Sequence, residues 1–281
     1  MSLSPGPDER ASARLADLTW PEVKAAAADD TPVVLPVGAT EQHGPHLPLA
    51  TDALLAERLG VEVAAGLGLL VAPPIAYGYR SRPLSGGGEG FPGTISLSGR
   101  TLMALVEDVL SGLVASGFHR LILLNWHFEN SNFIYEAAWL AHERVRNPDV
   151  RVIVIEAAFS ELSPAVMDAL FADEFPGWDA EHAAVLETSL MLHLYPTLVH
   201  FERAIDDGAA LRPGYDVIPI PAELVPQSGT LWKATRASAA KGELAWGEIV
   251  RRVHDALAFE LTRSASTSPA RKPPPGAKAA R

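Results

Sequence analysis

Two short polar segments of the chain carry residues that could together bind metal ions. Glu41 and His43 come directly after one short apolar run, and His127 and Glu129 come directly after another. In extended backbone, residues two positions apart project to the same side, so each Glu/His pair can converge on one point. Imidazole nitrogens and carboxylate oxygens are common metal ligands in proteins. The two segments therefore predict a metal site.

A fifth candidate ligand follows the first segment, at the start of a predicted helix. Five protein ligands exceed what one catalytic zinc ion usually takes; they are Glu41, His43, Asp52, His127 and Glu129. Asp52 has two oxygens and could bridge two ions roughly 3.5–4 Å apart, with a nucleophilic hydroxide between them. Buried carboxylates without compensation are costly, and divalent cations offset that cost. This donor set fits zinc, manganese or iron better than copper(I).

A third segment adds residues suited to substrate binding and proton transfer. His182 follows Trp178 and Asp179 and precedes a predicted helix. A histidine beside a metal hydroxide is a natural proton carrier to a leaving nitrogen, although a histidine at a helix start often has no catalytic part. Trp178 offers an apolar face to a planar substrate, or is simply a core residue. Glu187, five positions after His182 in the same predicted helix, is expected to face elsewhere unless the first turn of that helix is irregular.

The loop at 77–93 is too long and too rich in glycine to be a plain connection, which indicates a functional role. The backbone amides of Ser85, Gly86 and Gly87 could hold a substrate carbonyl or an oxyanion. No Walker, dinucleotide-binding or nucleophile-elbow pattern accompanies them.

Three further polar residues lie close to the candidate ligands in sequence. We interpret His46 as a supporting or structural residue rather than a ligand. Asn125 and Asn130, which bracket the second segment, are expected to form turns and to hydrogen-bond the residues around the ligands.

The elements that must position these residues alternate between strands and helices. Short apolar runs predict strands at 33–37, 69–72, 121–124 and 150–155. Helical patterns cover 15–28, 53–65, 99–116, 131–146, 164–171, 183–194 and 241–261. This alternation predicts an α/β fold, a three-layer sandwich whose central, mostly parallel sheet is flanked by helices. Ligands of such sheets gather beyond the carboxyl ends of the strands, where both polar segments lie.

Composition limits the classes of partner and location. The 281 residues can bury a substantial core, and the formal net charge of -11 argues against nucleic-acid binding. No apolar run approaches the roughly 20 residues of a membrane span, and the N-terminus lacks a signal-peptide pattern. The absence of cysteine excludes thiolate chemistry and weakly favours a cytoplasmic protein. We expect a flexible arm at 1–13, a single domain at 14–263 and a disordered tail at 264–281.

Longer strings resemble a known family. LPVGATEQHGPHLPLATD and NWHFENSNFIYE are similar to the two metal-binding signatures of the creatininase (creatinine amidohydrolase) family. The similarity continues through YGYRSRPLSGGGEGFPGTISL, FPGWDAEHAAVLETSLMLHLYP and GTLWKATRASAAKGE, and covers roughly residues 30–255.

The resemblance implies a two-metal hydrolase with a central, mostly parallel sheet and usually a homohexameric assembly. Carried over by motif, Glu41 and His127 would hold one ion, and His43 and Glu129 the other. Asp52 would bridge the two ions. In this family, metal-activated water attacks the ring carbonyl of creatinine and opens the lactam to creatine.

The same resemblance assigns roles around the substrate. His182 and Glu129 would take part in catalysis, His182 as the proton carrier. Trp178 would pack on the substrate ring, with Phe128 and Asp179 also in the substrate pocket.

Two differences from the family bear on the substrate. The family has Gly and Tyr beside the second-segment histidine, where this chain has Trp126 and Phe128, and it has a loop tryptophan near the positions of Ala157 and Ala158. We expect a metal-dependent amidohydrolase that opens a cyclic amide, with creatinine the first candidate. The alternatives are the same metals acting on a formamide, another lactam or a short peptide, and a non-catalytic metal- or ligand-binding protein.

Overall fold

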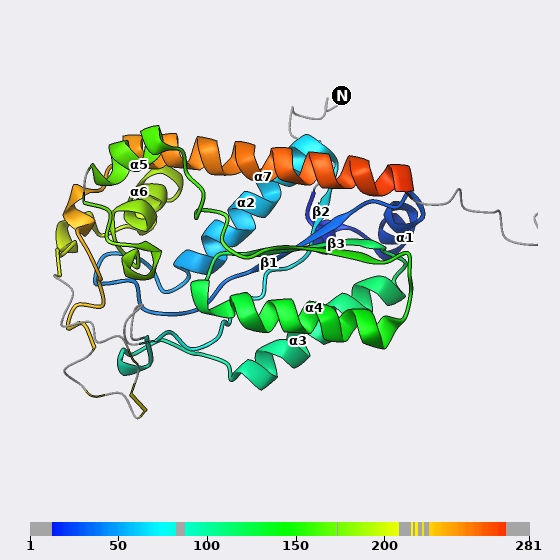
Figure 1. Cartoon of the computed structure of the whole chain (residues 1–281), viewed down its shortest axis with the longest axis horizontal. Helices are drawn as coiled ribbons and strands as arrows, with labels where there is room; N and C mark the ends of the chain where they lie inside the picture. Colours follow the sequence, from blue (N-terminus) through cyan, green and yellow to red (C-terminus); the bar gives the residue numbers. More distant parts are fainter. Residues whose placement is uncertain are drawn as a thin grey trace, which may run out of the picture.

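A parallel sheet runs through the middle of the protein and is covered by helices on both faces (Figure 1). The computed structural model describes residues 13–82, 88–172, 174–207, 215, 217–218, 221 and 225–267, without the side chains of 264–267. The strands are β1 (Val33–Val37), β2 (Leu70–Val71), β3 (Arg120–Asn125) and β4 (Arg151–Ile155), in the order β2-β1-β3-β4. All three strand pairs are parallel, which confirms the predicted α/β class.

Helices form the two outer layers. They are α1 (Trp20–Ala28), α2 (Thr51–Leu67), α3 (Gly99–Ala115), α4 (Ser131–Val145), α5 (Pro164–Phe171), α6 (Val185–Leu194) and α7 (Ala239–Thr267). Helices α1, α3 and α4 pack on one face of the sheet, and α2, α6 and α7 pack on the other. Among the residues described, no helix is both long and apolar enough to cross a membrane.

The alternation of side chains along the strands produces two separate cores. Val33 and Leu35 of β1 pack with α1, α3 and α4, whereas Val34 between them packs with α2 and α7. In β3, Leu121 faces the first core and Ile122 the second. Because successive residues of a strand point to opposite faces, a continuous apolar run is required in a sheet that is covered on both sides.

Most helix boundaries follow local signals, with three corrections. The helix predicted at 15–28 begins only at Trp20, where Thr19 and Glu22 form a capping box. Helix α2 runs to Leu67, beyond the predicted end at 65, because Gly68 is the glycine that adopts the left-handed conformation and caps the helix. Helix α7 extends to Thr267 and so enters the segment predicted as a disordered tail; residues 268–281 lie outside the described part of the chain.

The strand order brings the two polar segments together. β1 and β3 are adjacent at the centre of the sheet and pair from Val33 with Leu121 to Val37 with Asn125. The chain moves from β1 outward to β2 on one side and from β3 outward to β4 on the other. In open parallel sheets, ligands bind beyond the carboxyl ends of the strands where the order reverses in this way. The segments that follow Val37 and Asn125 both start at that point.

Gly38 allows the N-terminus of α2 to approach the end of β1. A Cβ on Gly38 would lie 2.5 Å from the nitrogen of Ala53 and 2.7 Å from the carbonyl carbon of Asp52. Both neighbours are backbone atoms and cannot move without displacing the helix. The absence of a side chain at Gly38 therefore places Asp52, in the first turn of α2, against the end of the central strand.

We predict that Gly38→Ala destabilises the fold, because the added methyl group overlaps the backbone of α2. Overpacking of this kind typically costs about 1–3 kcal/mol, measured as the free energy of unfolding in denaturant. Gly112→Ala is the matched control. Gly112 is an exposed position of α3, and a Cβ there would meet nothing within 4 Å. This variant should therefore gain about 0.5–1 kcal/mol in free energy of unfolding. Equal stability of the two variants would contradict the assigned contact.

Candidate metal centre

The carboxylate of Asp52 lies between two histidines. Its Oδ1 is 3.2 Å from Nε2 of His43, and its Oδ2 is 3.1 Å from Nδ1 of His127. The histidines come from the loops after β1 and β3, and all three side chains are almost fully buried. One carboxylate therefore presents each of its oxygens to a different imidazole, which is the arrangement that a bridging metal ligand requires.

Glu41 completes a group around His127. Its Oε1 is 3.2 Å from Nδ1 of His127, and the ligand atoms of Glu41, Asp52 and His127 all lie within 4.8 Å of one another. Nε2 of His127 lies 2.9 Å from the carbonyl oxygen of Tyr79. A carbonyl only accepts, so Nε2 donates, and Nδ1 is the nitrogen that a cation would take. Ser81 donates a hydrogen bond to the other oxygen of Glu41.

Glu187 completes a second group, around His43. Its Oε2 is 3.7 Å from Nε2 of His43, and the ligand atoms of His43, Asp52 and Glu187 lie within 4.8 Å of one another. Nδ1 of His43 donates to the carbonyl oxygen of Glu41, at 3.2 Å. Within the described part of the chain, Nε2 of His43 has no hydrogen-bond partner. A buried nitrogen that faces two carboxylates without a hydrogen bond fits a divalent cation.

The resemblance implied that Glu129 would lie with His43, but Glu129 lies beside His127 instead. Its Oε2 is 3.6 Å from Nε2 of His127, and its Oε1 accepts a long hydrogen bond, 3.4 Å, from the backbone nitrogen of Arg82. That nitrogen of His127 is not the one that faces Asp52. The predicted pairing of His43 with Glu129 is therefore replaced by a pairing of His43 with Glu187.

Glu187 reaches the site because the first turn of the predicted helix is irregular, which is the exception that the sequence left open. Helix α6 starts only at Val185, and Ala183 has a φ of 51°, so the chain turns between the two residues. The backbone nitrogen of Ala183 also donates to Oε2 of Glu187, at 2.7 Å. Spacing alone could not reveal this turn, since alanine is uncommon in the left-handed region.

Electrostatics bind the four central side chains to one another. Burial disfavours the charged imidazoles, but the facing carboxylates outweigh it and raise the pKa of His43 and of His127 well above the usual value. Burial also opposes ionisation of Glu41 and Asp52, yet the imidazoles hold the pKa of both below the usual value. A cation that takes the same nitrogens must therefore displace protons.

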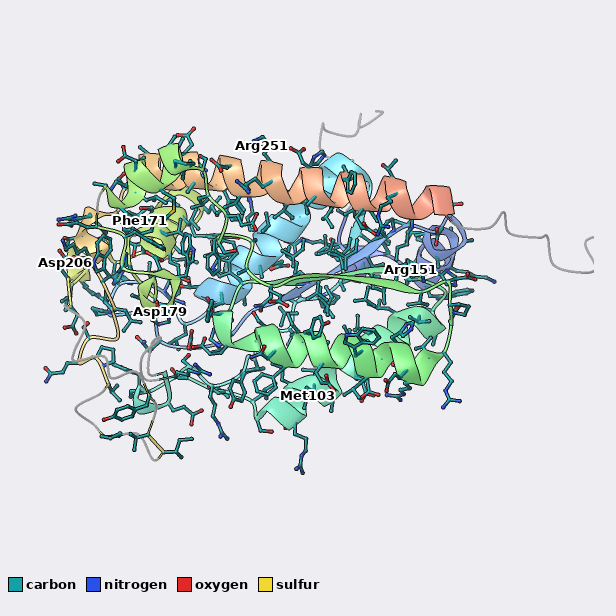
Figure 2. All side chains as sticks on the ribbon, in the orientation of Figure 1. Met103, Arg151, Phe171, Asp179, Asp206 and Arg251 are labelled. Atoms are coloured by element: carbon teal, nitrogen blue, oxygen red, sulfur yellow. The ribbon has the colours of Figure 1, made fainter. Side chains whose placement is uncertain are left out.

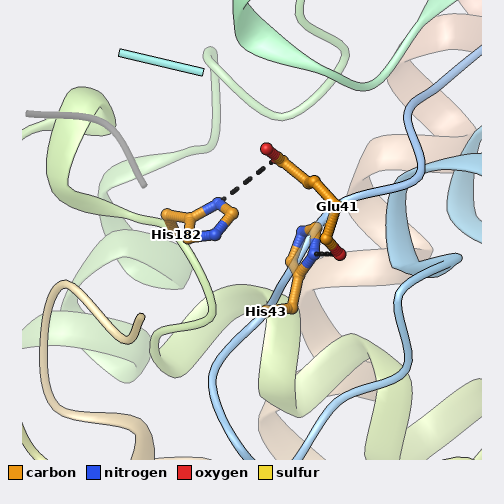
Figure 3. A group of neighbouring side chains, drawn as sticks. All are labelled: Glu41, His43 and His182. Atoms are coloured by element: carbon orange, nitrogen blue, oxygen red, sulfur yellow. Dashed lines mark hydrogen bonds and ion pairs between the residues drawn. The ribbon is translucent and has the colours of Figure 1, made fainter. Parts of the chain in front are cut away.

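His182 lies beside both groups. Its Nδ1 is 3.7 Å from Oε1 of Glu41, and its ring centre is 4.4 Å from that of His43 (Figure 3). His182 is 7 % exposed and lines a cavity next to the carboxylates. The residue predicted as a proton carrier is thus in contact with the ligand cluster and open to the space where a substrate would bind.

The cavity contains about 360 Å³ of space, part of it open to solvent. It is lined by Glu41, Asp52, Trp126, His127, Phe128, Glu129, Phe159, Trp178, Asp179, Glu181, His182 and Glu187. Phe128 and Asp179 are exposed, and Asp179 lies at the end of the molecule near Phe171, away from Arg151 at the start of β4 (Figure 2). Ser85, Gly86 and Gly87, predicted to bind substrate, lie outside the described residues.

An aromatic wall closes one side of this cavity, and its middle residue was missed in the sequence. The ring of Phe159 lies 5.3 Å from that of Trp126 and 5.5 Å from that of Trp178, between ring centres. Phe159 belongs to the loop after β4 and directly follows Ala157 and Ala158. The sequence signal that could have identified it is that Phe159 is the one aromatic residue between β4 and α5.

The supporting residues connect the segments around the cluster. His46 bonds through Nε2 to Oγ1 of Thr188, at 2.8 Å, and burial lowers its pKa to about 4, so it stays neutral. Asn125 donates to the carbonyl oxygen of His127, at 2.6 Å, and Asn130 donates to that of Gly38, at 3.0 Å. These contacts fix the backbone of both polar segments relative to each other.

Comparisons with known proteins identify the family of this chain. Residues 16–257 match the Creatininase family, described as creatinine amidohydrolase. The creatinine amidohydrolase of Pseudomonas putida is 44% identical over 249 residues, which are 87% of this chain and 96% of that protein. The mycofactocin precursor peptide peptidase of Mycolicibacterium smegmatis is 32% identical over 236 residues, 80% of this chain and 83% of that protein.

Solved structures give the same result. A crystal structure of creatinine amidohydrolase superposes with a TM-score of 0.86 at 44% identity, covering 89% of this chain and 98% of that one. Related creatininase structures include a variant in complex with creatine, a zinc–zinc form and a manganese form. The match over most of the sequence and the shared fold show that this chain belongs to the creatininase family.

Proposed function

We propose that the protein is a dinuclear metal-dependent amidohydrolase that opens the ring of creatinine to give creatine. The observation that supports it most directly is the placement of Asp52, whose two oxygens face His43 and His127. The 44% identical relative from Pseudomonas putida is named for the same activity.

In this proposal, each ion has its own ligands and shares one. Glu41 and His127 would hold the first ion, His43 and Glu187 the second, and Asp52 both. Divalent ions in such a site polarise the amide carbonyl and lower the pKa of water, so that no serine or cysteine nucleophile is needed. Imidazole and carboxylate donors fit zinc or manganese, the metals named for two related structures.

The remaining side chains of the cavity would bind the substrate and move the proton. His182, next to Glu41, would carry a proton to the leaving ring nitrogen. The wall formed by Trp126, Phe159 and Trp178 suits the face of a planar ring. Asp179 offers an acceptor for substrate N–H groups. Since Phe159 follows the alanines of the loop, we propose that it supplies the aromatic surface that the missing loop tryptophan would otherwise give.

Three properties expected from the sequence stay predictions. They are the single domain at 14–263, the homohexameric assembly and the cytoplasmic location. The proposed partner is a small amide, and neither the charge of the chain nor its composition favours nucleic acid.

The direct test is turnover of a panel of amides by the protein loaded with zinc or manganese. We expect creatine to form from creatinine, measured by chromatography. His182→Ala should keep its metal content and slow turnover by roughly 10²–10⁴-fold, the usual worth of general acid–base catalysis. Hydrolysis of a formamide, another lactam or a short peptide, without turnover of creatinine, would reject the proposed substrate. A fully loaded protein that hydrolyses no amide would favour a binding role.

A second prediction concerns the pH dependence of metal binding. The facing carboxylates raise the pKa of His43 and of His127, which favours the protonated rings before a cation binds, so binding should release protons. Affinity should therefore fall as the pH falls, by roughly tenfold per pH unit for each proton displaced. Calorimetry in buffers of different ionisation enthalpy measures the release. His127→Ala should release fewer protons and lose metal, and proton release equal to that of the wild type would contradict the assignment.

A third prediction tests the aromatic wall. Phe159→Ala should raise KM for creatinine by roughly 3- to 10-fold, since an aromatic contact is worth about 0.5–1.5 kcal/mol. The matched control is Phe175→Ala. Phe175 also packs on Trp178, with ring centres 4.8 Å apart, but is not among the described residues that line the cavity. A similar rise in KM for both variants would mean that only the packing of Trp178 matters.

A further inference from the structure

Two groups of Gln42, one from its backbone and one from its side chain, lie within hydrogen-bond distance of Nε2 of His182. The backbone oxygen of Gln42 lies 2.9 Å from Nε2 of His182, and the side-chain nitrogen of Gln42 lies 3.0 Å from the same atom. Both side chains are buried. Gln42 stands in sequence between the candidate ligands Glu41 and His43, but it is not one of the residues assigned to the proposed metal site.

The direction of the Gln42 amide is set by two further hydrogen bonds. Its Oε1 accepts from the backbone nitrogen of Gly44, at 2.9 Å, and its Nε2 donates to the carbonyl oxygen of Gly229, at 3.0 Å. Because Oε1 faces a donor and Nε2 faces an acceptor, the flipped orientation of the amide would lose both hydrogen bonds, so only one orientation is possible. Gly229 has a φ of 79°, and a Cβ there would overlap Oε1 of Gln42. The glycine thus allows the close approach that fixes the amide.

This arrangement determines how the ring of His182 is turned. If Nε2 carries a proton, it donates to the backbone oxygen of Gln42, and if Nε2 carries none, it accepts from the side-chain amide. Nε2 therefore has a partner in either tautomer, and Nδ1 is the nitrogen left on the side of Glu41 (Figure 3). Without the side-chain amide, only the tautomer with the proton on Nε2 would have a partner there.

We propose that Gln42 is a positioning residue that holds His182 with Nδ1 toward the substrate and supports the tautomer that carries its proton on Nδ1. The proposal rests on the proposed function in one respect, namely that His182 donates a proton to the leaving nitrogen. Gln42 touches neither the substrate nor the ions in this scheme. The proposal therefore requires the effect of Gln42 on turnover to depend on the presence of His182, whereas a purely structural role would not.

The test is a double-mutant cycle with Gln42→Met and His182→Ala in the metal-loaded enzyme. Gln42→Met should lower kcat by roughly 5- to 50-fold, the worth of one buried hydrogen bond, while KM changes by less than about 3-fold and metal content is unchanged. In the His182→Ala background, the same substitution should change kcat by less than about 3-fold. Gln227→Met, at an exposed glutamine of the 225–232 segment, is the control and should match the wild type.

Two results would overturn the role of Gln42. One is an equal loss of kcat in both backgrounds, and the other is a loss of metal from Gln42→Met, since either would indicate a general structural effect. Gln42→Glu serves as a second variant if Gln42→Met folds poorly. It retains an acceptor for Gly44 but replaces the amide donor at His182 with a second acceptor, so kcat should fall as for Gln42→Met.

A readout without substrate separates this proposal from the proposed function. Nitrogen NMR of the histidine rings, with His182→Ala to assign the signal, reports which nitrogen of His182 carries the proton. We expect Gln42→Glu to shift that proton to Nε2. An unchanged signal would refute the role of Gln42 even in an active enzyme. A wild type inactive toward every amide would refute the proposed function and leave the NMR test valid.

Discussion

One carboxylate shared by two buried imidazoles is the interaction on which the site depends. Asp52 reaches this position because α2 begins against the end of β1, where Gly38 has no side chain to hold the helix away. The histidines reach it because β1 and β3 are adjacent and parallel, so the segments that follow them start at the same edge. A charged cluster this deeply buried is costly unless every charge is matched. The proposed pair of divalent ions would provide that match.

The two flanking groups make the site asymmetric. Around His127, Glu41 and Asp52 face the ring nitrogen that is free to bind, while the other nitrogen is held by a backbone carbonyl. Around His43, the second carboxylate comes from Glu187 of α6, which is far from His43 in the sequence. The cluster therefore ties α6 to the edge of the sheet as well as α2. Binding of the proposed ions would for that reason be coupled to correct packing of these helices.

The sequence predicted the strands and most of the helices because both cores leave a strong periodic pattern, as in β1 and α3. It also predicted which residues gather at the sheet edge, since the two polar segments directly follow the ends of strands. It did not predict the partner of His43, because the turn before α6 puts Ala183 in the left-handed region, and an alanine does not signal that conformation. Phe159 was missed for a similar reason: a loop residue has no periodicity that reveals where its ring packs. The ends of α2 and α7 were placed wrongly because several residues there could end a helix.

In the proposed site, Asp52 would bridge two ions, each with its own histidine. The most direct measurement of this arrangement is anomalous diffraction from crystals of the protein loaded with zinc or manganese. We expect two anomalous peaks on either side of Asp52, one against Glu41 and His127 and the other against His43 and Glu187. A single peak, or peaks that do not contact Asp52, would contradict a shared carboxylate at the centre of this site.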